Sequence, residues 1–103
     1  MSVVYINDSN FESEVLNSDK PVLIDFFASW CSPCKMLSPV LDSLAEEHPE
    51  YKICKVDVDK SEELARKFSV MSIPSLFVIK EGKIVSRAQG YRRKEQLLEL
   101  LEG

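Results

Sequence analysis

Long apolar segments, a signal-like N-terminus and a set of structural disulfides are all missing from this sequence. Its longest apolar stretches, residues 21–27 and 73–79, fall well short of the roughly 18 residues that a membrane-spanning helix needs. No positively charged region followed by a long apolar one opens the chain, so we expect a soluble, cytoplasmic protein that binds no membrane. Three cysteines are too few for a disulfide framework.

Concentrated positive charge is also lacking. Lysine and arginine total 13 against 17 acidic residues, which gives a net charge of -4, and the basic residues are scattered except in the run 92–94. This distribution argues against nucleic acid as a partner. Arg92, Arg93 and Lys94 stand where a helix is expected to begin, and cations there oppose the helix dipole. We hypothesise that the run steers acidic partners, and the alternative is an ordinary solvated surface.

The length of 103 residues predicts one globular domain spanning residues 1–103, and we expect a monomer. A domain of this size buries roughly two thirds of its unfolded surface, so it needs neither a metal nor disulfides to fold. The cysteines are therefore free for chemistry.

Two kinds of periodicity alternate along the chain. Apolar, β-favouring runs predict strands at 3–6, 22–27, 53–58, 75–79 and 84–89, with a hairpin turn at Glu81-Gly82. Helical spacing predicts helices that carry Phe11, Val15 and Leu16, then 33–47, then a short one capped by Asp59 or Ser61, and a last one with Leu97, Leu98, Leu100 and Leu101. This order predicts an α/β fold: a mixed sheet with helices on both faces.

Two cysteines stand where a predicted buried strand gives way to a helix. Residues three apart in a helix have Cβ atoms about 5 to 6 Å apart, so Cys31 and Cys34 can form a disulfide without refolding. Unpaired N–H groups and the positive end of the helix dipole favour a thiolate at Cys31, which predicts that Cys31 is the nucleophile. Cys34, one turn further and against the core, is the expected resolving thiol. Pro33 suits the first helical turn and stiffens the disulfide ring.

Zinc binding is the alternative for this cysteine pair. Cys31, Cys34, His48 and Cys54 fall at spacings that resemble a four-ligand zinc module. His48, however, lies 14 residues beyond Cys34 along a continuous predicted helix, which corresponds to about 21 Å. We therefore expect no shared metal ion, a buried strand position for Cys54, and a helix-terminal role for His48.

The chain resembles the thioredoxin family over essentially its full length. The family motif Trp-Cys-Gly-Pro-Cys-Lys is present as Trp30-Cys31-Ser32-Pro33-Cys34-Lys35, and further matches are Asp25-Phe26, Pro39, Lys55-Val56-Asp57, Ile73-Pro74, Gly82 and Gly90. The resemblance implies the thioredoxin fold, with a first strand parallel to two neighbours and an antiparallel final pair. It also implies a cis peptide bond at Ile73-Pro74, whereas the residues alone allow an ordinary proline at a strand start.

The resemblance implies that Asp25 is a general acid/base for Cys34. Leu23 and Phe27 share its face of the strand, so we expect apolar surroundings that raise the pKa of Asp25, opposed by Lys55 from another strand. The alternative is a structural salt bridge between the two charged residues.

A groove for substrate is also implied by the resemblance. The backbone of Ile73, before Pro74, would lie beside Cys31 and pair with a client strand, with Trp30 and Gly90 on its two sides. Ser32 and Pro33 are expected to belong to the same surface. The Ser32 hydroxyl, where the family has glycine, is expected to donate to the Cys31 sulfur and shift the reduction potential upward within the reducing range.

The implied activity is reduction of protein disulfides by dithiol–disulfide exchange. Electrons would come from NADPH or another donor through a flavin-containing thioredoxin reductase, and the chain itself would hold a redox-active disulfide and no bound cofactor. Two alternatives stay open. One is a more oxidising oxidase or isomerase of the same fold, which Pro33 disfavours because such proteins have histidine at that position. The other is a binding or scaffold module in which the dithiol is incidental.

Overall fold

A five-stranded mixed sheet forms the centre of the molecule in this computed structural model, which describes residues 2–103. The strand order is β1-β3-β2-β4-β5, with β1, β3 and β2 parallel and with β4 and β5 each antiparallel to the strand before it in that order. The strands are β1 (Val4–Ile6), β2 (Val22–Phe27), β3 (Lys52–Asp57), β4 (Ser75–Lys80) and β5 (Lys83–Gln89). The predicted mixed sheet and antiparallel final pair are confirmed.

One implied feature of the sheet is wrong. The first strand was expected to have two parallel neighbours, but β1 lies at an edge and pairs only with β3. The central position between two parallel partners belongs to β3, because β3 lies between β1 and β2.

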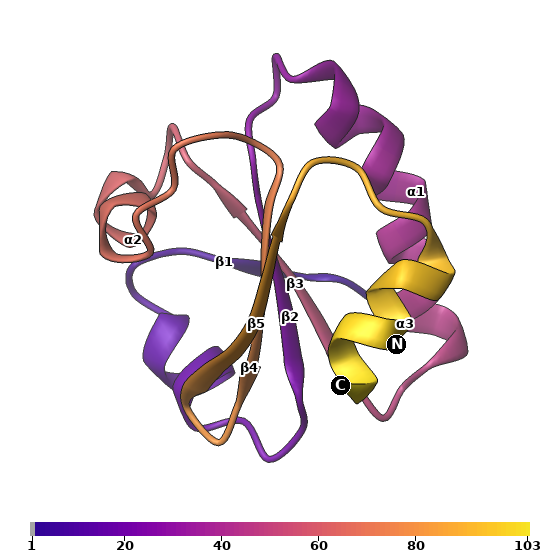
Figure 1. Cartoon of the computed structure of the whole chain (residues 1–103). Coiled ribbons are helices and arrows are strands. Elements are labelled where there is room, and N and C mark those ends of the chain that lie inside the picture. Colours follow the sequence, from indigo (N-terminus) through magenta and orange to yellow (C-terminus); the bar gives the residue numbers. More distant parts are fainter. Residues whose placement is uncertain (1) are drawn as a thin grey trace.

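Helices cover both faces of this sheet, as the alternating pattern predicts. The helices α1 (Ser32–Glu47) and α3 (Lys94–Glu102) pack on one face, while η1 (Glu12–Leu16) and α2 (Glu62–Lys67) pack on the other (Figure 1). Two apolar cores result, one on each side of the sheet. None of the helices within residues 2–103 has the length and apolarity that crossing a bilayer requires.

Strand β2 contributes to both cores because successive side chains of a strand point to opposite faces. Ile24 and Phe26 pack with the η1 and α2 side, and Leu23 packs with the α1 and α3 side. Asp25 shares the parity of Leu23, so its carboxyl group faces the α1 and α3 side and is fully buried. The strand that ends at the cysteine pair therefore carries an acidic group inside the protein.

The first predicted helix differs from expectation in type. It is a short π-helix, in which the Asn17 N–H donates to the Glu12 carbonyl five residues back at 3.0 Å. Phe11 and Val15 are buried, as their spacing predicts. The side chain of Asn7 accepts from the N–H groups of Ser9 and Asn10, and so it stabilises the turn before the helix.

The predicted hairpin between β4 and β5 is confirmed. Glu81 and Gly82 both have positive φ angles, +52° and +77°, the conformation of the tight turns that match the twist of antiparallel strands. The five strands and the helix predicted at 33–47 lie within one or two residues of their predicted bounds, and Ser61 caps α2 as one of its two predicted cap residues.

Packing of α1 on the sheet predicts a large cost for truncating its inner face. Leu41 is fully buried, so Leu41→Ala should lower the free energy of unfolding by about 3 kcal/mol in urea titrations. Met36→Ala on the same helix is the control, because Met36 is 63% exposed. This substitution should lower the free energy of unfolding by about 0.5 kcal/mol or less, as is usual for surface positions. Equal losses in the two variants would contradict this account of the core.

Candidate active site

The structure joins Cys31 and Cys34 in a disulfide at the start of α1. Cys31 is the residue before the helix and has an extended backbone (φ -95°, ψ 114°), while Cys34 lies in the first turn. Their Cα atoms are 5.3 Å apart, within the usual disulfide range. Pro33 occupies the second helical position, where its missing N–H leaves no helix hydrogen bond unmade.

The sulfur of Cys31 is bonded to the helix itself. The backbone N–H of Cys34 donates to Cys31 Sγ at 3.2 Å, so the sulfur fills the place of a capping oxygen on one of the unpaired amides of α1. The side chains of Cys31 and Cys34 have similar exposed fractions, 5% and 3%, so exposure does not distinguish them. Their positions relative to the helix start do, because only Cys31 faces the positive end of the dipole.

Ser32 does not make the predicted hydrogen bond in this disulfide form. Its side chain is exposed, and its hydroxyl has no hydrogen-bond partner among residues 2–103. The donor to the Cys31 sulfur is instead the Cys34 amide. The reason is local geometry: the helix already directs a backbone donor at the sulfur.

A loop far away in sequence lies against the disulfide. The Ile73-Pro74 peptide bond is cis, as the resemblance implies, and Ile73 packs against Ala28 and the two cysteines. The Gly90 N–H donates to the Pro74 carbonyl at 2.8 Å. Gly90 has a φ of +86°, a conformation that favours glycine, and its hydrogen bond holds it against the cis-proline loop.

Trp30, which precedes Cys31 in the chain, is not a core residue, because 68% of its surface is exposed. It borders a hollow of about 190 Å³ together with Val58, Met71 and Ile73. Its Nε1–H donates to Asp59 Oδ2 at 2.9 Å. From the sequence, Asp59 was expected only to cap the following helix. The missed signal is that Trp30 and Asp59 each follow one of two parallel strands, whose carboxyl ends meet at one edge of the sheet.

Asp25 is buried without any hydrogen bond, since neither of its carboxyl oxygens has a partner in the described part of the chain. Loss of solvation raises its pKa from the ordinary 3.8 to about 7, and the Lys55 charge opposes this rise. Lys55 lies opposite Asp25 in the β2–β3 register, as expected.

Lys55 is directed toward helix α1. Its Nζ donates to Ser38 Oγ at 3.0 Å and lies 4.5 Å from the centre of the Phe27 ring. No ion pair joins Lys55 to Asp25 among residues 2–103, so the alternative of a structural salt bridge is not formed.

The zinc alternative disagrees with the arrangement of its proposed ligands. Helix α1 is unbroken, so His48 follows its far end, where Nδ1 lies 3.0 Å from Glu50 Oε2. Cys54 is buried in the core on the other face of the sheet, and burial raises its pKa to about 12. Within residues 2–103, no group of three or more histidine, cysteine, aspartate or glutamate side chains is placed to hold a metal ion.

A mixed sheet with a disulfide at a helix start, faced by a cis-proline loop, defines a domain for thiol–disulfide exchange. The family model for thioredoxin matches residues 2–103. A thioredoxin of Haemophilus influenzae is 50% identical over 92% of this chain and 90% of its own length, and one of Bacillus subtilis is 46% identical over 98% and 96%. The chain belongs to the thioredoxin family.

A further relative is a longer, bifunctional protein. The bifunctional thioredoxin reductase/thioredoxin of Mycobacterium leprae is 44% identical over 92% of this chain, which corresponds to 21% of that longer protein.

The raised pKa of Asp25 predicts a pH-dependent stability. Between 3.8 and about 7 the unfolded chain ionises Asp25 while the folded chain keeps the proton, so the free energy of unfolding falls as the pH rises. The loss is complete above pH 7, where it reaches roughly 4 kcal/mol. Asp25→Asn should remove this loss, and so the variant should be more stable than the native disulfide form at about pH 8.

Denaturant titrations of the oxidised protein across this pH range test the prediction. Asp42→Asn on the exposed side of α1 is the control and should follow the native pH profile. A native profile that is already flat between the two pKa values would show that Asp25 is solvated in solution.

Proposed function

We propose that this chain reduces protein disulfides through Cys31 and Cys34, as a thiol–disulfide oxidoreductase of the thioredoxin type. The observation that carries the proposal is the Cys31 sulfur at the start of α1, bonded to a helix amide. The same amide and the dipole stabilise the Cys31 thiolate in the reduced protein, and the thiolate is the reactive form.

The exchange has two steps that conserve electrons. The Cys31 thiolate attacks a sulfur of the client disulfide, which forms a mixed disulfide and releases one client sulfur as a thiolate. The Cys34 thiolate then attacks Cys31 Sγ, closes the Cys31–Cys34 disulfide and releases the second client sulfur. The client gains two electrons, and the protein ends in the disulfide form described above.

Asp25 serves as the general base that takes the proton from the Cys34 thiol. A pKa of about 7 leaves Asp25 partly ionised near neutral pH, which suits an acid/base that must both accept and return a proton. Lys55 limits how far burial raises that pKa. Burial and the Lys55 charge together therefore set the proton affinity of the group that we propose as the base for Cys34.

The surface around the disulfide binds the client chain. The backbone of Ile73 offers β-type hydrogen bonds, Pro74 fixes its course, and Trp30 and Gly90 border the two sides. Ser32 and Pro33 are exposed at the helix start and face the same client.

A thioredoxin reductase returns the protein to the dithiol form. Thioredoxins work with such reductases, and the bifunctional relative has a reductase and a thioredoxin in one protein. The reductase would carry electrons from NADPH or another donor, and this monomeric chain would itself hold no cofactor. Dithiols persist in reducing compartments such as the cytoplasm, which is where we place the protein.

Two cysteine variants test the proposed roles. Cys34→Ser should trap a client as a mixed disulfide on Cys31, because the resolving thiol is gone, and Cys31→Ser should trap nothing. The Cys54→Ala variant should reduce an insulin-like protein disulfide at the native rate. Cys54 is a free cysteine buried in the core, outside the proposed active site. Trapping on residue 34 instead would reverse the assignment. A scaffold with an incidental dithiol would trap no client in any variant.

Replacing Asp25 tests the proton transfer separately. The native rate of mixed-disulfide resolution should rise with pH and level off above about 7, as Asp25 becomes ionised. Asp25→Asn should lose that rise and slow resolution near pH 7 by roughly tenfold to a hundredfold. Stopped-flow tryptophan fluorescence of Trp30 gives the rates. Native rates in the variant across this range would exclude Asp25 as the base.

A further inference from the structure

A second hollow, of about 370 Å³, lies next to the cis-proline loop and differs in charge from the rest of the molecule. Arg87 and Arg92 line it together with Phe68, Ser75, Phe77 and Gln89, and no acidic side chain of the described chain does. The protein as a whole carries a net charge of -4. The hollow is therefore a local cationic site on an acidic protein.

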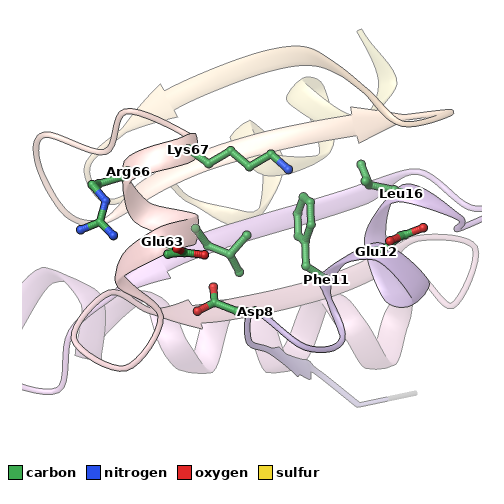
Figure 2. A pocket seen from close by; sticks show the side chains of 8 residues that line it. Asp8, Phe11, Glu12, Leu16, Glu63, Arg66 and Lys67 are labelled. Atoms are coloured by element: carbon green, nitrogen blue, oxygen red, sulfur yellow. The ribbon is translucent and has the colours of Figure 1, made fainter.

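A larger hollow elsewhere shows the contrast. The space of about 540 Å³ between η1 and α2, shown in Figure 2, is bordered by Asp8, Glu12 and Glu63 as well as by Arg66 and Lys67. Charges of both signs surround it, so it favours no single ligand charge.

Arg92 is held in place and keeps free donors. Its Nη1 donates to the carbonyls of Gln89 at 2.7 Å and Tyr91 at 3.1 Å. An arginine has five N–H donors, and both of these bonds use only Nη1. The donors on Nε and Nη2 therefore have no partner within residues 2–103. This free edge is the planar pair of donors that binds both oxygens of a carboxylate.

Arg87 adds a second charge to the hollow. Its guanidinium lies 5.5 Å from the centre of the Phe77 ring and pairs with no carboxylate of the described chain. Stacking on the ring restricts the side chain while leaving the donors at its rim available.

The basic run 92–94 does not act as one surface. Lys94 turns to helix α1, where Nζ contacts Glu47 at 2.8 Å and Ser43 at 2.9 Å, which offsets the cost of a cation at the start of α3. Arg93 Nε lies 3.9 Å from Glu95 on the exposed side. Of the three, only Arg92 lines the hollow.

The hollow adjoins the proposed client groove through direct contacts. A Cβ atom placed on Gly90 would lie 3.7 Å from Arg92 Nη1, and the Gly90 N–H is bonded to the Pro74 carbonyl. Ser75, which follows Pro74, pairs with Gln89 in the sheet and lines the hollow. A client strand beside Ile73 therefore lies two residues from Ser75, which lines the hollow together with the two arginines.

We propose that Arg87 and Arg92 form a carboxylate subsite, through which the protein prefers clients that carry aspartate or glutamate next to the reactive disulfide. The subsite rests on the proposed function, since it selects among substrates of that reaction. It adds a specificity-determining pair of residues to the cysteines that perform the exchange.

Two matched peptides test the preference. They share one disulfide and one sequence, except that glutamate in the first replaces glutamine in the second at the positions flanking the cysteine. The reduced native protein should react with the glutamate peptide about fivefold faster at low salt, and the ratio should fall as salt screens the charges. Arg92→Gln and Arg87→Gln should each bring the ratio toward one while leaving the rate with the glutamine peptide unchanged.

Lys83→Gln is the matched control, because it removes one positive charge at the other end of β5. It should keep the native ratio, and a ratio lowered as much as in Arg92→Gln would overturn the subsite in favour of overall charge. Equal native rates with both peptides would overturn the subsite and leave the proposed function intact. If the native protein reduced neither peptide, the proposed function would fail together with the subsite.

Discussion

The hydrogen bond between the Cys34 amide and the Cys31 sulfur is the contact on which the site depends. A helix leaves its first amides without partners, and here a sulfur takes the position that an oxygen of serine or aspartate usually fills. The bond requires that β2 end where α1 begins, so that Cys31 stands just outside the helix. The sheet supplies that junction, and Ile73 of the cis-proline loop packs against the two cysteines there.

The buried carboxyl group of Asp25 is the second constraint, because a stable core normally excludes polar groups that have no hydrogen-bond partner. Asp25 has no hydrogen-bond partner and no ion pair in the described chain, so its charged form is destabilised by burial. Lys55 reduces this penalty only at a distance, because its ammonium group is bonded to Ser38. Two apolar cores on the faces of the sheet make the penalty tolerable. A proton affinity near neutral pH is what the acid/base role proposed for Asp25 requires.

Much of the fold was predictable because its signals are local. Apolar runs and helical spacing located five strands and most helices, and Glu81-Gly82 marked the hairpin, since each depends on residues close together in the chain. The π-helix was not predictable, because Phe11 and Val15 have the same inward spacing in either helix type. The edge position of β1 was missed as well, since strand order depends on pairing between distant segments.

The cysteine pair, its place at a helix start and the burial of Asp25 follow from the amino-acid order alone, because spacing and strand parity act over a few residues. The partners of these residues depend on how distant segments pack together. The bond from Trp30 to Asp59, the bond from Lys55 to Ser38 and the bond from Lys94 to Ser43 each join segments far apart in the chain. Such contacts follow from sheet register and helix packing, and neither is encoded in the periodicity of any single segment.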